Sequence, residues 1–481
     1  MTFGALPDDV LLEIFDFYLA RMNLNFESTW FRRYPEDAWH KLVHVCKRWR
    51  SIVFASPHRL KLQLLCTIKN PLQKTLDIWP ELPIVIGGDL IMSTPHSKPW
   101  YANNIIAALK QHDRVAKIDM NEIPRSLLTR LWATEMRDPF SALTSLRLHS
   151  SLDAPALPDS FLGGSTPRLQ TLSLCGIPFP ALPSLLLSTR DLVELRLWNI
   201  PLFGHISPDA MVTCLSALTR LKSLVLTFQS PRSRADRENR LVLRLTRPVL
   251  PTLTSFNFAG DTEYLEHIVG QIDTPLLAQF KITFFHQLVY DTPLLHRFIG
   301  RTEMFKAHRA ELIFGACEVE AKLYPRNDDE ISSLAICKPF DWSLSSVGVA
   351  QVCDLALSTL PTLDLEHLKI RIVLGWDDDD VENAQWVALL HPFTSIKDLI
   401  LCDESIQRVA LALEELAGER LTEALPTLQN LFLSGPQPSD PVKKAIWKFV
   451  AARQLSGRPV AVHHRDWPKL AWQQMHWEVG D

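Results

Sequence analysis

Leu143-Thr144-Ser145-Leu146-Arg147-Leu148 has leucine at its first, fourth and sixth positions, and this spacing returns along most of the 481-residue chain. In its second half apolar and polar residues alternate, which is the period of a β-strand with one buried face. We call this six-residue pattern, with apolar residues at its first, fourth and sixth positions, a frame. Further frames start at Val115, Leu169, Leu192, Leu221, Leu253, Leu277, Leu365, Ile396 and Leu428. The sequence therefore predicts a series of short, similar strands.

Consecutive frames from 143 to 277 and from 365 to 428 are 23 to 32 residues apart, which leaves room for one helix between strands. One such unit cannot bury its apolar face alone, so the units must stack. The pattern is a leucine-rich-repeat signature of irregular length, and it mostly lacks the asparagine that usually follows the last leucine position. The register is lost between 283 and 363, where we expect strands at 310–314, 319–324 and 333–337 and a helix at 343–360, with the continuity of the array left open.

The N-terminal residues predict a pair of helices. Pro7 suits the first helical position, and Asp8 and Asp9 place negative charge at the positive end of the helix dipole. The apolar stripe of this helix comprises Leu11, Ile14, Phe15 and Tyr18. A second helix is expected from about Glu36 to Val53, ended by Ser56-Pro57.

These helices resemble a known motif. Leu6-Pro7-Asp8-Asp9-Val10-Leu11-Leu12-Glu13-Ile14-Phe15, followed by Leu42-Val43-His44-Val45-Cys46-Lys47-Arg48-Trp49-Arg50, resembles an F-box, the helical motif that binds the Skp adaptor of cullin–RING ubiquitin ligases. The connection over 21–37 is longer than is usual in that family, and the region 386–460 is similar to the C-terminal part of basidiomycete (mushroom-type) fungal F-box proteins. The resemblance implies an adaptor-binding set of Leu6, Pro7, Val10, Leu11, Ile14, Phe15, Val45, Cys46 and Trp49.

The expected fold class is α/β, with an all-α module before an irregular leucine-rich-repeat-like solenoid. We assign 1–68 to the F-box helical module, 69–100 to a junction with a short strand near 84–86, and 101–440 to the solenoid. The range 441–481 would hold a C-terminal helix, capped at Asp440-Pro441, and a capping tail.

Composition restricts the class of protein. Hydrophobic residues make up 47% and charged residues 22%, as in ordinary folded proteins, and the net charge of -4 weighs against a nucleic-acid partner. There is neither a signal-peptide pattern nor an apolar run of 18 residues, so we expect no membrane span. The eight cysteines are at least 16 positions apart, which indicates reduced thiols in an intracellular protein, cytoplasmic and/or nuclear.

The chain lacks the usual signatures of catalysis. Nucleophile-elbow, P-loop and dinucleotide-binding glycine patterns are all missing from the sequence. His40 and His44 have the spacing of a zinc pair, but Lys41 replaces the glutamate base of a metalloprotease; the pair His463-His464 would point its rings apart, and the acidic run 377–380 does not fit an EF-hand loop. We therefore expect no enzyme activity, no cofactor and no metal.

The strand residues that alternate with the leucines should line the concave face, the usual binding surface of such arrays. Their central positions are Arg147, Ser173, Arg196, Val225, Asn257, Lys281, Lys369, Ile400 and Phe432, and neighbouring outward positions add Trp198 and Arg371. The candidate substrate-binding residues are Arg147, Arg196, Trp198, Lys281, Lys369 and Arg371, which would hold an acidic or phosphorylated protein segment. The alternative is a solvated strand face whose basic excess is chance.

Together these patterns predict the substrate-recognition subunit of an SCF-type cullin–RING ubiquitin ligase. Its partners would be a Skp-type adaptor, through it a cullin, and an unknown protein substrate. Two other interpretations stay open: a leucine-rich-repeat scaffold unconnected with ubiquitin transfer, in which the N-terminal helices are only a cap, and an enzyme built on an α/β repeat.

Overall fold

The computed structural model describes two compact units, Met1–Ile206 and Ser207–Asp481, which we treat separately. The described residues are 6–24, 38–57, 59–66, 76, 82–89, 100–150, 154–180, 182–201, 204, 206–229, 247–284, 292–302, 307–315, 318–325, 333–339, 365–373, 383–418, 421, 423–435 and 438–464. Over these residues, no helix has both the length and the apolar character needed to cross a membrane.

The first unit begins with three helices: α1 (Asp8–Leu24), α2 (Ala38–Val43) and α3 (Lys47–Ala55). The prediction of one helix from about Glu36 to Val53 is therefore wrong. The chain leaves the helix after Val43 and becomes extended at Cys46, whose φ is -158° and ψ is 170°. The sulfur of Cys46 accepts a hydrogen bond from the backbone N–H of Trp49 at 3.4 Å, so Cys46 starts a new helix as its N-cap.

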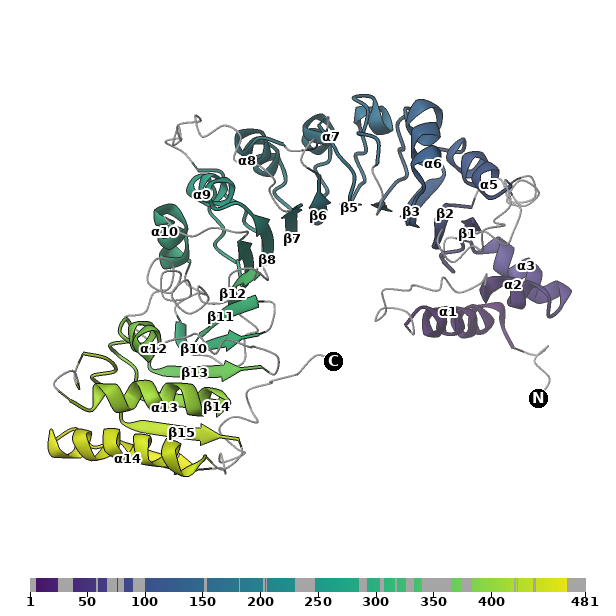
Figure 1. Cartoon of the computed structure of the whole chain (residues 1–481). Helices are drawn as coiled ribbons and strands as arrows, with labels where there is room; N and C mark the ends of the chain where they lie inside the picture. The colour runs from purple at the N-terminus through teal and green to yellow at the C-terminus, as the bar shows by residue number, and fades with distance from the viewer. Residues whose placement is uncertain are drawn as a thin grey trace. The chain divides into compact units, whose positions relative to one another are not determined.

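A parallel sheet follows in the first unit, with its strands in chain order (Figure 1). Its strands are β1 (Leu64–Cys66), β2 (Ile84–Asp89), β3 (Val115–Asn121), β4 (Ser145–His149), β5 (Thr171–Cys175) and β6 (Glu194–Ile200). The connections include α5 (Trp100–Leu109), α6 (Arg125–Arg130) with a π-helical turn at Leu131–Glu135, a 3-10 turn at Phe161–Gly164, and α7 (Leu182–Ser188). The expected strand near 84–86 is confirmed as part of β2, and the sheet already begins at Leu64.

Among the described residues, the second unit contains a longer sheet and as many α-helices as the first. Its helices are α8 (Pro208–Ala217), α9 (Thr262–Gln271), α10 (Pro293–Arg301), α12 (Asn383–Leu390), α13 (Ser405–Leu416) and α14 (Asp440–Leu455). Its strands are β7 (Ser223–Phe228), β8 (Ser255–Gly260), β9 (Gln279–Phe284), β10 (Ala307–Phe314), β11 (Glu318–Pro325), β12 (Ser333–Pro339), β13 (His367–Ile372), β14 (Asp398–Asp403), β15 (Asn430–Ser434) and β16 (Ala461–His464).

Strands β10 to β12 answer the question of continuity that the sequence left open. They form an antiparallel meander, in which β12 pairs in parallel with β9 and β10 pairs in parallel with β13. Because three antiparallel strands restore the original strand direction, the parallel array resumes after the insertion. The helix expected at 343–360 lies outside the described residues.

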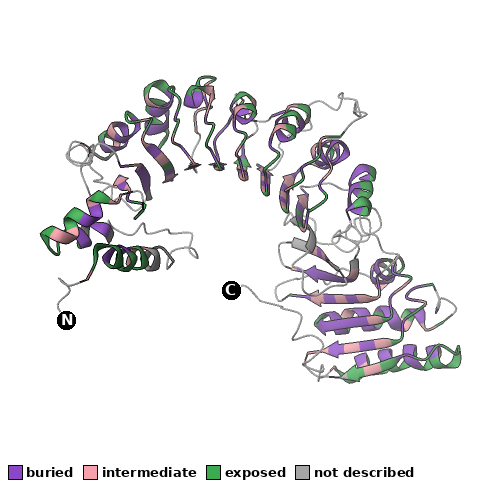
Figure 2. Ribbon diagram, turned by 180° about the vertical axis from the view of Figure 1, so that it is seen from behind, coloured by how far each residue is buried: buried purple, intermediate pink, exposed green. Residues whose placement is uncertain are grey.

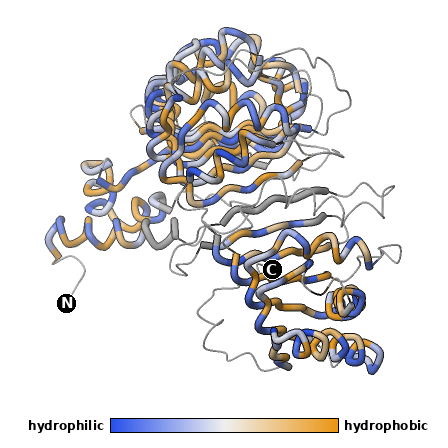
Figure 3. The backbone as a smooth tube through the Cα atoms, turned by 90° about the vertical axis from the view of Figure 1, so that its left-hand side faces the viewer, coloured by the Kyte–Doolittle hydropathy of each residue, from blue (hydrophilic) through white to orange (hydrophobic). Residues whose placement is uncertain are grey.

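The predicted inward positions form the core of both units. Strands such as β4, β5 and β7 alternate between buried and half-buried residues. Hydrophobic stretches, coloured orange, recur through the stacked strands (Figure 3). The helices carry both buried and exposed residues, as one-sided packing requires (Figure 2). Ile400 lies in register with Lys369 and Phe432, the other residues predicted at this outward position, but unlike an open strand residue it is fully buried. Its aliphatic side chain favours this burial.

The phrase Leu-Pro-Thr-Leu occurs at 250–253, 360–363 and 425–428, and its threonine has the same role in both described copies. The Thr252 hydroxyl lies 3.0 and 2.9 Å from the carbonyl oxygens of Thr219 and Leu221 in the preceding turn. In the same way the Thr427 hydroxyl lies 2.9 Å from the carbonyls of residues 394 and 396. Each threonine thus ties one repeat to the one before it by donating to two of its backbone carbonyl oxygens.

Candidate protein-binding surfaces

The interior of the N-terminal helical module is built from part of the predicted adaptor-binding set. Leu11 and Phe15 of α1 are fully buried, and the Phe15 ring lies 4.7 Å from that of Trp49 on α3. Leu12, one residue beyond the predicted stripe, is buried with them. Leu11 and Phe15 therefore support the module from inside and are not available to a partner.

Charged groups hold α1 against α3. The guanidinium of Arg48 donates to the Asp8 carboxylate and to the carbonyl oxygen of Leu6, with Nη2 2.5 Å from each oxygen. Arg59 forms an ion pair with Glu13 of α1. Ion pairs this exposed contribute little energy each. Arg48 also donates to the carbonyl of Leu6, just before α1, and so joins this end of α1 to α3.

Large apolar side chains remain exposed on this module. Val10 and Ile14 are each 41% exposed, Phe17 is 71% exposed, and Val45, after α2, is 58% exposed. Val10, Ile14 and Phe17 follow at i, i+4 and i+7, so they share one face of α1. We call these three residues the α1 apolar patch.

The predicted adaptor-binding set is thus divided between surface and core. Its other members are Pro7 and Cys46, which are exposed, and Leu6 and Trp49, which are half-buried. Phe17 was missed because the stripe at Leu11 and Phe15, which proved to be core, dominates the helical pattern of α1. The spacing of Val10, Ile14 and Phe17, which form a second apolar face on the same helix, could have revealed it in the sequence.

The accessibility of Cys46 leads to a prediction about thiol reactivity. Burial raises the pKa of Cys66 to about 12 and that of Cys214 to about 11, whereas Cys46 is exposed. Because the thiolate is the reactive form, we expect iodoacetamide at neutral pH to modify Cys46 at least tenfold faster than either buried thiol, as measured by peptide mass spectrometry. Equal rates for Cys46 and Cys66 in the folded chain would contradict this placement.

In the first unit, the candidate arginines on the open face of the sheet, opposite the helices, already face an acidic group. Arg147 lies 3.7 Å from one carboxylate oxygen of Glu194, and Arg196 forms an ion pair with the other. Arg147 is also the register partner of Asp119, which holds the corresponding position of the frame that begins at Val115. The face is therefore mixed in charge, which favours the interpretation as a solvated strand surface.

Trp198 is the aromatic candidate on this face, and it is half-buried. The guanidinium of Arg196 lies 5.9 Å from its ring centroid, a cation–π geometry. The structure thus brings three of the predicted residues together: Arg147 and Arg196 share Glu194, and Arg196 lies over the ring of Trp198.

In the second unit the candidate residues do not form one cluster of free cations. Lys281 on β9 is exposed, whereas Lys369 on β13 lies 3.1 Å from Glu311, a buried carboxylate on β10. Arg371 on β13 is half-buried. Sequence reasoning missed Glu311 because the meander that carries it lies outside the repeat register.

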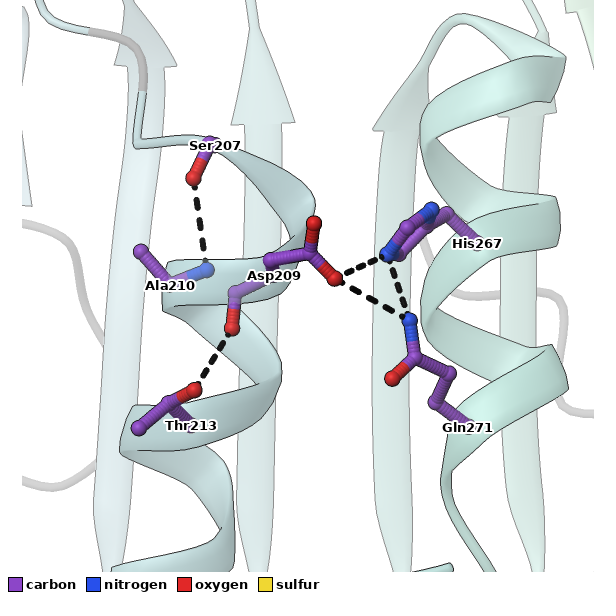
Figure 4. A network of polar contacts seen from close by, with 6 residues as sticks. All are labelled: Ser207, Asp209, Ala210, Thr213, His267 and Gln271. Atoms are coloured by element: carbon purple, nitrogen blue, oxygen red, sulfur yellow. Dashed lines mark hydrogen bonds and ion pairs between the residues drawn. The ribbon is translucent and has the colours of Figure 1, made fainter. Parts of the chain in front are cut away.

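A polar network joins α8 and α9 in the second unit (Figure 4). Asp209 lies near the start of α8, and its Oδ1 atom is 2.7 Å from Nε2 of His267 and 3.3 Å from Nε2 of Gln271, both on α9. Ser207 caps α8 by accepting a hydrogen bond from the N–H of Ala210. The contacts of Asp209 with His267 and Gln271 link the two neighbouring helices, and the Ser207 cap fixes the start of α8.

Fold and surfaces together define a class: an α/β protein of stacked leucine-rich-type repeats, preceded by a helical module with an exposed apolar patch. No family model matches the chain, and no curated protein matches it either. Among solved structures, the chain is similar to a leucine-rich repeat-containing protein from Legionella pneumophila, with 12% identity and a TM-score of 0.27, covering 85% of this chain and 99% of that one. Because the similarity is this weak, the description of the fold depends on the structure of this chain alone.

Proposed function

We propose that this chain is a protein-interaction receptor, and that it is the substrate-recognition subunit of an SCF-type cullin–RING ubiquitin ligase. In this proposal the N-terminal helices bind a Skp-type adaptor and the repeat sheet binds a protein substrate. The observation that carries it is the α1 apolar patch: Val10, Ile14 and Phe17 are exposed on a helix whose sequence resembles an F-box.

Apolar side chains clustered on one helical face are a typical recognition surface for a helical partner. Asp8 and Glu13 form ion pairs with Arg48 and Arg59 and stay largely exposed, so α1 offers a partner the apolar patch with carboxylates close to it in the sequence. A more general function, a repeat-type scaffold for protein binding, is supported by the repeat array alone. It would hold even if the chain bound no adaptor.

The test is co-purification of the full-length chain with a Skp-type adaptor and a cullin. We expect the double substitution Val10→Asp/Ile14→Asp to weaken adaptor binding about 30-fold or more, because replacing central apolar anchors removes about 2 to 4 kcal/mol. Leu455→Asp is the matched control, because Leu455 is 90% exposed at the end of α14 and far along the chain from α1. Leu11 is unsuitable as a target because it is buried and its change would unfold the module.

Three outcomes separate the possibilities. Loss of adaptor binding in the double variant, with retention in Leu455→Asp, supports the ligase subunit. If the intact chain does not bind the adaptor, the ligase proposal is wrong, and the N-terminal helices are then only a cap on a scaffold. Equal binding by the intact chain and the double variant would mean that the α1 apolar patch is not the adaptor surface.

A further inference from the structure

Three side chains with metal-binding atoms meet where strands β10 and β13 begin. His308 is the second residue of β10, Glu366 directly precedes β13, and His367 is its first residue. The backbone N–H of Glu366 donates to the carbonyl of His308 at 3.0 Å, and Arg309 is the register partner of His367. Strand pairing itself therefore sets the relative positions of the three residues.

Their ligand atoms have the separations of one coordination sphere. Nε2 of His308 lies 3.2 Å from Nε2 of His367 and 3.7 Å from Oε2 of Glu366, and the ligand atoms of all three residues lie within 4.8 Å of one another. In tetrahedral zinc sites with bonds of about 2.0–2.1 Å, neighbouring ligand atoms are about 3.4 Å apart. The two measured separations fall on either side of that value.

The surrounding groups orient two of these ligands. Nδ1 of His367 lies 2.7 Å from the Asp398 carboxylate, whose other oxygen accepts a hydrogen bond from Asn430 at 2.7 Å. A carboxylate this close to Nδ1 favours the tautomer that carries its proton on that nitrogen, which leaves the lone pair of Nε2 for a metal ion, as partners of metal-bound histidines commonly do. Oε1 of Glu366 lies 3.0 Å from Nζ of Lys397, which leaves Oε2 on the side of His308.

We propose that His308, Glu366 and His367 bind a divalent first-row metal ion, zinc, which ties the β10–β12 meander to the repeat that follows it. Two imidazoles and one carboxylate are a ligand set that zinc accepts, and the half-exposed side chains leave a fourth position for water. The carboxylates of Glu366 and Asp398 offset the charge of the ion. A hydrogen bond between the two rings would give a similar spacing without an ion, and only metal binding distinguishes the two.

The experiment is calorimetric titration of zinc chloride into the full-length chain after removal of metals with a chelator, repeated with cobalt(II) to record its visible absorption. We expect one equivalent of zinc to bind, and cobalt to show the intense bands of tetrahedral coordination. His308→Ala and His367→Ala should abolish this binding, and Asp398→Asn should weaken it about 10- to 100-fold by removing the group that orients His367.

His149→Ala is the matched control. His149 is also a half-exposed strand histidine beside a carboxylate, with Nδ1 3.5 Å from Glu122. We expect this variant to bind zinc as the intact chain does. Circular dichroism in chelator checks that each variant folds, and Asp398→Asn, which keeps all three ligands, provides the test if a histidine variant does not.

An intact chain that binds no zinc overturns the proposal. So does binding of equal strength by the intact chain and the folded His367→Ala or Asp398→Asn variant, which would place the ion on other histidines or thiols. Failure of the adaptor test leaves this inference untouched, because the site lies in the second unit and its readout is metal binding alone.

Discussion

Lys369→Met should lower the free energy of unfolding of the second unit by about 3–5 kcal/mol. The side chain of Glu311 is 2% exposed and lies 3.1 Å from the Lys369 ammonium, so the substitution leaves a buried carboxylate without its cation. The loss should appear in urea unfolding and as faster hydrogen exchange of the amides of β10 and β13, the two strands that this pair joins.

Two further variants separate this effect from a general loss of charge. Lys281→Met removes an exposed lysine from β9 and should change stability by less than about 0.5 kcal/mol. Lys369→Met/Glu311→Leu removes both partners of the ion pair and should recover most of the lost stability, because an apolar pair of similar size can replace a buried ion pair. A stable single variant would show that Lys369 is not a structural residue and would return it to the substrate-binding candidates.

Glu266→Ala should destabilise the start of α10 by about 3 kcal/mol or more. Glu266 lies on α9 and is buried, and its carboxylate accepts hydrogen bonds from the backbone N–H groups of Leu294 and Leu295 at 2.9 and 2.6 Å. It therefore caps a neighbouring helix, where the dipole favours negative charge. Each hydrogen bond to a charged group contributes about 1.5–3 kcal/mol, and the alanine variant leaves two buried donors unsatisfied.

Hydrogen exchange is the suitable measurement because repeat arrays open locally. The amides of Leu294 and Leu295 should exchange about 100-fold faster in Glu266→Ala, which corresponds to about 3 kcal/mol. Glu263→Ala changes an exposed glutamate in the first turn of α9 and should leave α10 exchange unaltered. Unchanged protection in Glu266→Ala would mean that water or another group caps α10.

Much of the repeat architecture was predictable from the sequence. Frames such as the one at Leu143 identified strands β3 to β9 and β13 to β15, because burial on one face of a short strand depends only on local alternation. The helices with clear stripes were equally accessible: Val442, Ala445, Ile446, Phe449 and Val450 of α14 are all buried as predicted. The first N-terminal helix was predictable for the same reason, since Pro7, Asp8 and Asp9 directly precede its apolar stripe.

The division of α1 between core and surface was not predictable from periodicity alone. Leu11 and Ile14 lie on one apolar stripe in the sequence, yet the first is buried and the second exposed, because the ring of Trp49 packs on Phe15 from only one side. The break at Cys46 was also missed, since a cysteine N-cap is uncommon and its effect depends on the geometry of one sulfur and one N–H.

The sequence by itself determined the repeating α/β units, their strands and the helical module in front of them, because these follow from spacings within a few residues. Only the tertiary structure decided which charged residues meet. His308 and His367 are 59 positions apart, and Lys369 faces Glu311 across the same pair of strands. Their meeting depends on the parallel pairing of β10 with β13, which no local pattern encodes, because pairing between distant strands is selected by the packing of the whole sheet.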